Sequence, residues 1–520
     1  MGAARTVCSM AALALLVAGP AAAAAGPAEP AAGARLPGLT ASFEELDAFV
    51  EARAEAAGLP GIAYGIAQDG VVVHTAAFGV AGPDGRPMTT TTALNTASVG
   101  KTFTALAVAQ LAAGGAIDLD TPVQTYVPEF DLADHEAAAR ITVRHLLTHT
   151  SGLSTLDGNR PWLLNTDATV ADLVARMATL RPDRPVGGAF EYSNVNYVLL
   201  GAVVEAVTGQ GYHEYLSEHV LAPLGMDSTF RTAADARAAG LDVADGYRYL
   251  YGLPVADDVP MPLGAEAAGM QWTTIEDLAT YAAAFADHGA VDGRSLVTGE
   301  ATSTPDYDVD WLPAAWAPDD GFGHAGGWIT YSSGLEVLPG HRFAVVTLAN
   351  ANPAQGFPAE STFDIAFDTM RVAHGWPAQM ERTSVRTFYA WADALVLFLL
   401  AAVAWRWWRS RTWRVRFEGA STWRRRRMLV GWALVDLALP VGLLLALPPA
   451  LTGLPLGEAW VRLMTALPDA VGVVVTLGTA LTALGALKAV VMVRAFTRRR
   501  PHPAPGPAAA PPVAATPAGA

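Results

Sequence analysis

Ser98 and Lys101 are the residues whose types and spacing point most directly to chemistry. They lie three positions apart, so in a helix their side chains would share one face. A serine hydroxyl is a weak nucleophile at neutral pH and needs a base, and a lysine can be that base when burial lowers its pKa. The pair therefore predicts a nucleophilic serine. The alternative is a solvated lysine near a helix-capping serine, because this short pattern also arises by chance.

The residues after Ser98 predict the apolar helix that such a lysine needs. Phe103, Leu106 and Leu111 recur with helical period, and Gly114-Gly115 predicts the end of the helix. The threonine-rich run 89–92 before it predicts a loop. We therefore expect Ser98 at the mouth of a buried helix.

Two more polar motifs follow in the chain. Glu191-Tyr192-Ser193-Asn194 precedes an apolar helix predicted over 197–207. Gly323-His324-Ala325-Gly326-Gly327 precedes a hairpin predicted from strands 334–338 and 343–349. The alternatives are a core tyrosine with a capping asparagine in the first motif and a structural histidine in the second.

The surrounding segments predict an α/β core. A helix is expected over 42–57, followed by strands 61–67 and 71–78 joined by an Asp69-Gly70 turn. Helices are also expected over 141–149 and 363–373. Because strands lie at both ends with helices between them, the pattern predicts a sheet flanked by helices with an all-helical insertion domain.

The N-terminus predicts export. Arg5, an apolar run over 10–17 and the alanines at 21–25 are typical of a cleaved signal peptide, 1–25, although an uncleaved anchor helix is the alternative. Residues 26–39, rich in Ala, Pro and Gly, predict a linker. The only cysteine, Cys8, lies in the signal segment, so we expect no disulfide, cysteine nucleophile or thiolate metal site in the mature protein.

Three apolar segments, 388–405, 428–447 and 470–493, predict transmembrane helices. The loop over 406–427 is rich in arginine, and arginines also begin the tail 494–520, which we expect to be disordered. Positive charge stays cytoplasmic, so both are expected inside and the hydrolase-like part outside. The net charge of −15 and an acidic outer part argue against nucleic acid as a partner.

Two ionisable residues lie within these apolar segments. Asp436, in the second, suggests a functional site, with a helix-packing contact or a protonated acid as the alternative. Lys488, in the third, has a side chain long enough to extend its ammonium toward the membrane surface.

The three motifs in this order resemble the serine β-lactamase and penicillin-binding-protein superfamily. The tyrosine motif is similar to the class C branch with its D-peptidase and esterase relatives. The resemblance covers residues 40–375 and implies a β-lactamase/DD-peptidase-like fold with an antiparallel sheet. It is supported by four further stretches, His149-Thr150-Ser151-Gly152-Leu153, Pro223-Leu224-Gly225-Met226, Trp272-Thr273-Thr274 with Asp277-Leu278, and Leu348-Ala349-Asn350. We interpret His149 as structural.

The resemblance implies a role for each motif residue. Ser98 would attack a carbonyl and form an acyl-enzyme, and Lys101 and Tyr192 would move its proton. Which of these two is the base stays open. The backbone N–H groups of Ser98 and Gly327 would form the oxyanion hole.

Three further residues would bind substrate. Asn194 would hold an amide side chain, His324 would face a substrate carboxylate or orient Tyr192, and Gly326 would lie beside the substrate. Neither a metal nor a cofactor is implied. His324 replaces the lysine of many class C lactamases, and Ala325 lacks the usual hydroxyl, which weighs against an antibiotic-destroying enzyme.

The layout is similar to that of prodrug-activating D-peptidases with three membrane helices, although that group has a smaller residue at the position of Asn194. We therefore expect an exported, membrane-anchored serine hydrolase that cleaves an amide in a small molecule or peptide, beside a D-amino acid. The alternatives are an esterase or weak β-lactamase, and a non-catalytic cell-wall sensor. An oligomer formed through the membrane helices is left open.

Overall fold

The computed structural model describes residues 38–286, 290–291, 294–295, 312–313, 322–353, 361–379, 384–452, 455–466 and 468–497. The chain forms two compact units, Met1–Asp393 with Thr452–Asp469, and Ala394–Leu451 with Ala470–Ala520. The signal peptide predicted over 1–25, most of the linker over 26–39 and the tail beyond Thr497 lie outside the described residues.

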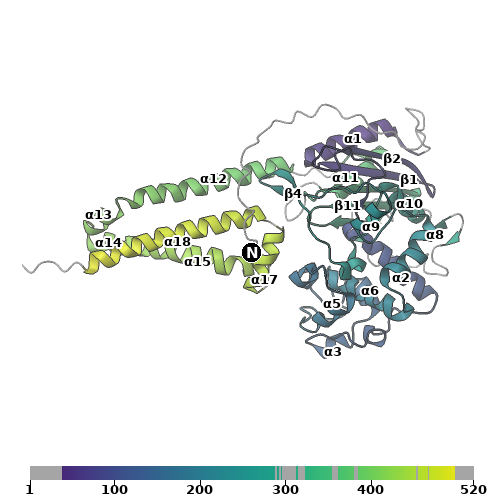
Figure 1. Cartoon of the computed structure of the whole chain (residues 1–520), viewed down its shortest axis with the longest axis horizontal. Helices are drawn as coiled ribbons and strands as arrows, with labels where there is room; N and C mark the ends of the chain where they lie inside the picture. Colours follow the sequence, from purple (N-terminus) through teal and green to yellow (C-terminus); the bar gives the residue numbers. More distant parts are fainter. Residues whose placement is uncertain are drawn as a thin grey trace, which may run out of the picture. The chain divides into compact units, whose positions relative to one another are not determined.

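A six-stranded sheet in the order β2-β1-β12-β11-β10-β9 organises the first unit (Figure 1). Every neighbouring pair is antiparallel, as predicted. At the first hairpin, Asp69 and Gly70 have φ of 54° and 81°, which a tight turn between twisted strands requires. The strands are β1 (Gly61–Gln68), β2 (Val71–Gly79), β9 (Leu312–Pro313), β10 (Phe322–Gly327), β11 (Ser332–Leu338) and β12 (Phe343–Ala349).

Alternate residues of β1 face two different cores, because side chains alternate across a strand. Ile62, Tyr64 and Ile66 pack against α1 (Phe43–Ala57) and α11 (Thr362–Ala373). Ala63 and Ala67 belong to the larger core on the other face, which includes α10 (Ile275–Ala286). The sheet is therefore covered by helices on both faces.

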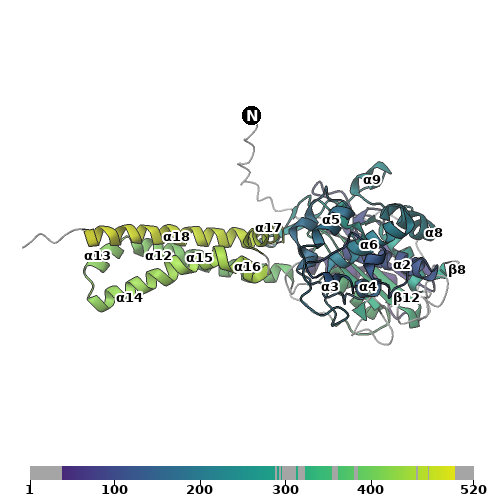
Figure 2. The same ribbon diagram turned by 90° about the horizontal axis from the view of Figure 1, so that it is seen from below.

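A helical region lies between the first and last strands, as predicted. The apolar helix α6 is buried along most of its length and contacts α2, α4 and α5 (Figure 2). The helices are α2 (Lys101–Ala113), α3 (His135–Ala138), α4 (Val143–Leu147), α5 (Val170–Met177), α6 (Asn194–Thr208), α7 (Tyr212–Leu216), α8 (Ala222–Leu224) and α9 (Ala233–Ala238). Short two-stranded sheets lie in the same part of the sequence. They pair β3 (Leu94–Asn95) with β6 (Trp272–Thr273), β4 (Tyr247–Leu250) with β5 (Leu253–Ala256), and β7 (Ala290–Val291) with β8 (Arg294–Ser295).

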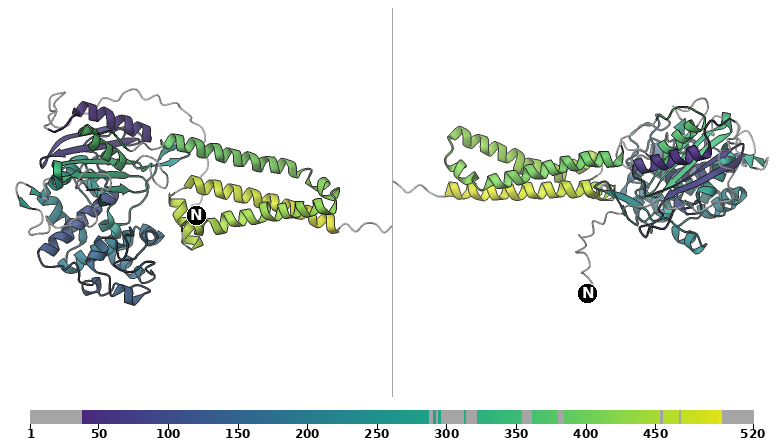
Figure 3. Two further views of the ribbon diagram at one scale, coloured as in Figure 1. Left: turned by 180° about the vertical axis from the view of Figure 1, so that it is seen from behind. Right: turned by 90° about the horizontal axis from the view of Figure 1, so that it is seen from above.

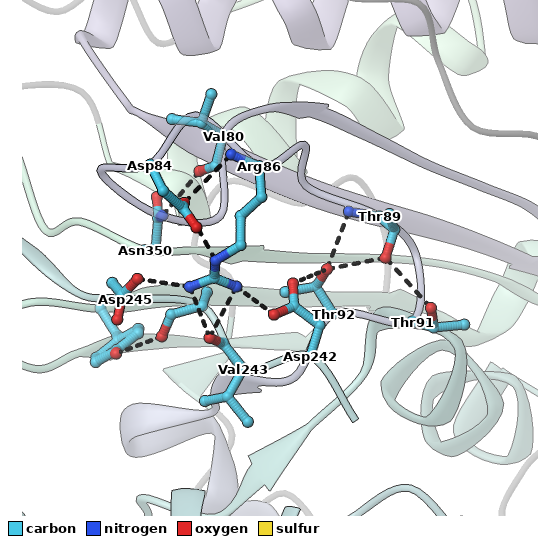
Figure 4. Close-up of polar contacts among 12 residues, drawn as sticks. Val80, Asp84, Arg86, Thr89, Thr91, Thr92, Asp242, Val243, Asp245 and Asn350 are labelled. Atoms are coloured by element: carbon cyan, nitrogen blue, oxygen red, sulfur yellow. Dashed lines mark hydrogen bonds and ion pairs between the residues drawn. The ribbon is translucent and has the colours of Figure 1, made fainter. Parts of the chain in front are cut away.

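Arg86 fixes the loop that leads from the sheet to Ser98 (Figure 4). Its guanidinium pairs with Asp84 and Asp242 and lies 2.5 Å from Asp245. The backbone of Ala93 then bonds to Asp242, with N to O of 2.8 Å. The threonine-rich loop is thus held to the segment around 242–245 just before β3 begins.

The second unit contains the apolar helices. Three stretches are long and apolar enough to cross a membrane, namely Tyr389–Ser410, Thr422–Ala450 and Val471–Val490. They lie side by side in Figure 3, within α12 (Val385–Ser410), within a run of helical segments from α14 (Thr422–Trp432) through α15 (Leu439–Val441) to α16 (Leu447–Thr452), and within α18 (Pro468–Thr497). The arginine-rich connection expected as a loop is largely helical, because α12 extends to Ser410 and α13 (Trp413–Glu418) follows.

Lys488, whose side chain is long enough to extend outward, instead lies between the apolar helices. It is buried, and its Nζ lies 2.5 Å from Asp436 Oδ2, while Arg406 Nη2 lies 2.6 Å from Asp436 Oδ1. The carboxylate of Asp436 supplies the opposite charge that a buried ammonium requires. Asp436 therefore makes the helix-packing contact that was the alternative to a functional site.

Candidate active site

Ser98 lies in a tight turn before the helix predicted to carry it. A 3-10 turn spans Ala97–Gly100, and α2 begins at Lys101. Ala97 has φ of 45°, a left-handed conformation that costs a non-glycine residue about 1–3 kcal/mol. Its N–H donates to Asn95 Oδ1 at 2.8 Å, and its carbonyl accepts from Met270 N at 3.1 Å. Neighbouring segments thus hold Ser98 partly exposed within this strained turn.

Lys101 and Tyr192 converge on the Ser98 hydroxyl. Lys101 Nζ lies 3.2 Å from Ser98 Oγ, and Tyr192 Oη lies 2.9 Å from the same atom. The serine and tyrosine are 94 residues apart in sequence. The structure therefore brings together the three groups between which protons would have to pass.

The ammonium of Lys101 is fully buried and surrounded by neutral acceptors. Besides Ser98 Oγ, it donates to Asn194 Oδ1 at 2.8 Å and to the backbone carbonyl of Ala268. It also lies 5.1 Å from the ring centroid of Tyr192 and 5.6 Å from that of Tyr197, where the aromatic faces favour a cation. Because burial of an unsolvated charge is costly, these contacts replace the water that the lysine has lost.

Asn194 joins the same cluster from the N-terminus of α6. Its Oδ1 accepts from Lys101, and its Nδ2 donates to the carbonyl of Gly158 at 3.0 Å. It also lines a small cavity of about 40 Å³ with Met270 and Trp328. The residue predicted to hold a substrate amide is thus already engaged on both ends of its own amide.

Arg160 forms another part of the wall of this cavity. Its Nη1 lies 3.1 Å from Glu458 on α17 (Leu456–Ala466), and its Nη2 lies 3.5 Å from Asp157. The segment between the second and third apolar helices therefore reaches the rim of the candidate site. Nothing in the sequence signalled this contact, because the two residues are 298 positions apart.

Gly326 allows β10 to pack directly against the Ser98 turn. A Cβ there would lie 1.9 Å from Ser333 Oγ, 2.7 Å from the carbonyl of Thr96 and 3.2 Å from Ser98 N. Gly327 is the next residue and ends β10. The strand that carries one predicted oxyanion donor thus runs beside the backbone that carries the other.

His324 lies on β10, two residues before Gly326, so it shares that face of the strand. The imidazole is buried, and its Nδ1 lies 2.8 Å from the carbonyl of Ala325. A carbonyl can only accept, so Nδ1 carries a proton. Its contact with substrate stays a prediction.

His149 packs against Tyr192, a relationship that the sequence did not reveal. The two ring centroids are 4.6 Å apart. His149 Nδ1 accepts from Ser193 N at 3.1 Å and from Asn196 Nδ2 at 3.0 Å, so the proton of the neutral ring is on Nε2. His149 thus holds the tyrosine motif, consistent with the structural interpretation.

Two carboxyl groups near the motifs have shifted pKa values. Hydrogen bonds from the side chain and backbone of Thr155, with Arg184 nearby, lower the pKa of Glu191. Burial raises the pKa of Asp277 to about 6, against opposing hydrogen bonds from Thr229 and Ser228. Within the described ranges, no group of three or more His, Cys, Asp or Glu side chains is placed to hold a metal ion.

Comparison with known proteins shows which family model and which relatives this chain is similar to. The family model described as Beta-lactamase matches residues 46–367. Unguisins hydrolase ungD' of Aspergillus campestris is 26% identical over 360 residues, covering 62% of this chain and 66% of that protein. Penicillin-binding protein 4 of Amycolatopsis lactamdurans is 28% identical over 322 residues, covering 58% and 83%.

A solved class C beta-lactamase shares the fold. It aligns with a TM-score of 0.52 at 19% identity, covering 64% of this chain and 97% of that one. The chain spans just under two thirds of the length of the Aspergillus relative. The C-terminal apolar helices begin after the segment that the family model matches.

Proposed function

This chain belongs to the Beta-lactamase family and is a serine hydrolase of it, and from that premise we propose that it is a membrane-anchored enzyme that cleaves an amide beside a D-amino acid. The observation that carries the proposal is the convergence of Lys101 Nζ and Tyr192 Oη on Ser98 Oγ, at 3.2 Å and 2.9 Å. A serine so placed can give up its proton as it attacks a carbonyl carbon.

In this mechanism Tyr192 takes the proton from Ser98. An ammonium has three N–H donors, and Lys101 has three acceptors in Ser98, Asn194 and Ala268. A lysine that uses all three donors has no lone pair with which to accept a proton. Its positive charge instead favours the tyrosinate form of Tyr192, which accepts the proton of Ser98 and becomes a neutral phenol.

The remaining steps follow from the same atoms. The backbone N–H groups of Ser98 and Gly327 would stabilise the oxyanion of the tetrahedral intermediate. Tyr192 would then pass its proton to the leaving amine, which releases the first product and leaves an acyl-serine. Water, activated by the same tyrosine, would hydrolyse that ester and regenerate Ser98.

The substrate would lie between β10 and the start of α6. His324 and Gly326 on β10 would face one side of it, and the cavity beside Asn194 would take a side chain. A mostly neutral histidine holds a carboxylate less strongly than a lysine does, which favours peptide-like amides over β-lactams.

Anchoring and orientation complete the proposal. The three apolar helices support insertion in a membrane. Arginines are concentrated over 406–427, between the first two of these helices, which favours a cytoplasmic position for that connection and an external position for the hydrolase. An oligomer formed through these helices stays a prediction.

A substrate panel on the full-length chain in detergent tests the function. We expect turnover of D-amino-acid amides to exceed that of a p-nitrophenyl ester and a chromogenic cephalosporin, with all turnover lost in Ser98→Ala. Faster turnover of the ester or the cephalosporin would instead favour the esterase or the weak β-lactamase. Equal labelling of the wild type and Ser98→Ala by a fluorophosphonate would contradict a catalytic role for Ser98, and would leave a cell-wall sensor as the alternative.

A further inference from the structure

The second unit contains a buried cluster of charges between its apolar helices. Asp436 contacts Arg406 of α12 at 2.6 Å and Lys488 of α18 at 2.5 Å. The helix backbone widens here into a π-helical segment, Ala433–Ala438, because Pro440 cannot donate to the carbonyl of Asp436 four residues earlier. Gly485 lets α18 approach that carbonyl, since a Cβ there would lie 2.4 Å from it.

A cavity of about 380 Å³ opens beside this cluster. Its wall contains four cationic side chains, Arg406, Arg409, Arg416 and Lys488, and one carboxylate, Asp436, which leaves a net charge of +3. Trp413 and Trp432 form apolar parts of the wall. Asp436 therefore accounts for only part of the positive charge that the fold gathers here.

The guanidinium groups around the cavity have capacity to bind an anion. Arg406 Nε is buried and has no hydrogen-bond partner among the described residues. Arg409 stacks on Trp405 at 4.7 Å, and Arg416 donates to backbone carbonyls of Thr412 and Arg409, so in the described part of the chain neither is paired with a carboxylate. A phosphate group, with several acceptor oxygens, suits such a set of donors.

We propose that this cavity binds the phosphate group of an anionic membrane phospholipid. The position favours a lipid: Arg409 and Arg416 line the cavity from the arginine-rich segment 406–427, and Met428 lines it directly after that segment, so the cavity reaches the arginine-rich end of the apolar helices. Basic pockets between helices at that level suit lipid headgroups, with tryptophans at the interface. The inference concerns a different site from the hydrolase and depends only on membrane insertion.

Native mass spectrometry of the full-length chain in a neutral detergent tests the proposal. Phosphatidylglycerol and phosphatidylcholine would be titrated onto the wild type, onto Arg409→Gln/Arg416→Gln and onto a matched control, Arg424→Gln/Arg426→Gln, whose arginines do not line the cavity. We expect the wild type to retain one phosphatidylglycerol molecule. The affinity for this lipid should be about 30-fold lower in Arg409→Gln/Arg416→Gln and little changed in the control.

Three results would overturn the proposal. One is equal retention of both lipids by the wild type, and another is equal loss of affinity in the two double variants. The third is displacement of phosphatidylglycerol by inorganic phosphate, which would mean that the site takes soluble phosphate. Retained binding in Arg409→Lys/Arg416→Lys would show that loss in the glutamine variant is not misfolding. None of these readouts uses hydrolase activity.

Discussion

Lys101 Nζ lies closer to Asn194 Oδ1, at 2.8 Å, than to Ser98 Oγ, at 3.2 Å. Asn194 therefore accepts a hydrogen bond that favours the ammonium form of Lys101, in addition to any contact that it makes with substrate. Because the other end of its amide is bound to Gly158, the orientation of this acceptor is fixed. This relationship changes how variants of Asn194 should be interpreted.

Asn194→Ala should slow acylation about 10- to 100-fold, because a hydrogen bond to a charged group contributes about 1.5–3 kcal/mol and Lys101 would lose it. The second-order rate constant for labelling by a fluorophosphonate measures the effect with little dependence on a substrate side chain. If Asn194 served substrate binding alone, that rate would be unchanged while KM for amide substrates would rise.

Tyr192→Phe should slow acylation by about 10²- to 10⁴-fold, the usual contribution of a positioned proton-transfer group. The ring would keep its packing against His149, so the melting temperature should change little. A burst of acyl-enzyme at the wild-type rate would assign the proton transfer to Lys101 instead.

Gly326→Ala should abolish most activity and destabilise the hydrolase unit by about 1–3 kcal/mol, as overpacking does. The added methyl would lie 1.9 Å from Ser333 Oγ and would push β10 away from the Ser98 turn. Gly211→Ala is the matched control, since a Cβ there meets nothing within 4 Å. Chemical unfolding and acylation rates would be compared, and equal behaviour of the two variants would argue against the close approach.

Asp277→Asn should alter the dependence of stability on pH. Burial raises the pKa of Asp277 to about 6, above its unfolded value, so the native state binds the proton more tightly. The stability due to this group is therefore present at low pH and falls as pH rises from about 4 to 6. The asparagine keeps an oxygen for Ser228 N and Thr229 Oγ1, both 2.8 Å from the present carboxylate.

The expected result is a free energy of unfolding for Asp277→Asn that exceeds the wild-type value at pH 8 by about 1–3 kcal/mol and converges with it near pH 4. Urea unfolding at several pH values measures this difference. A wild-type stability that rose with pH in that window, relative to the variant, would contradict the assigned direction.

The sequence by itself determined the features that depend on local pattern. The Asp69-Gly70 turn, the final hairpin and the apolar helices followed from residue type and periodicity, and their boundaries differ by only a few residues from those observed. The order of the Ser98, Tyr192 and His324 motifs identified the family, because each motif lies on a predictable element.

Only the tertiary structure decided how distant groups meet. The carbonyl of Ala268 on Lys101, the ring of His149 against Tyr192, and the pairing of Asp436 with Lys488 each join segments more than 40 residues apart. Backbone carbonyls have no signature in sequence, and the pairing of a buried charge depends on which helices pack together. Periodicity tells which face of an element is buried, and it cannot tell which face of another element covers it.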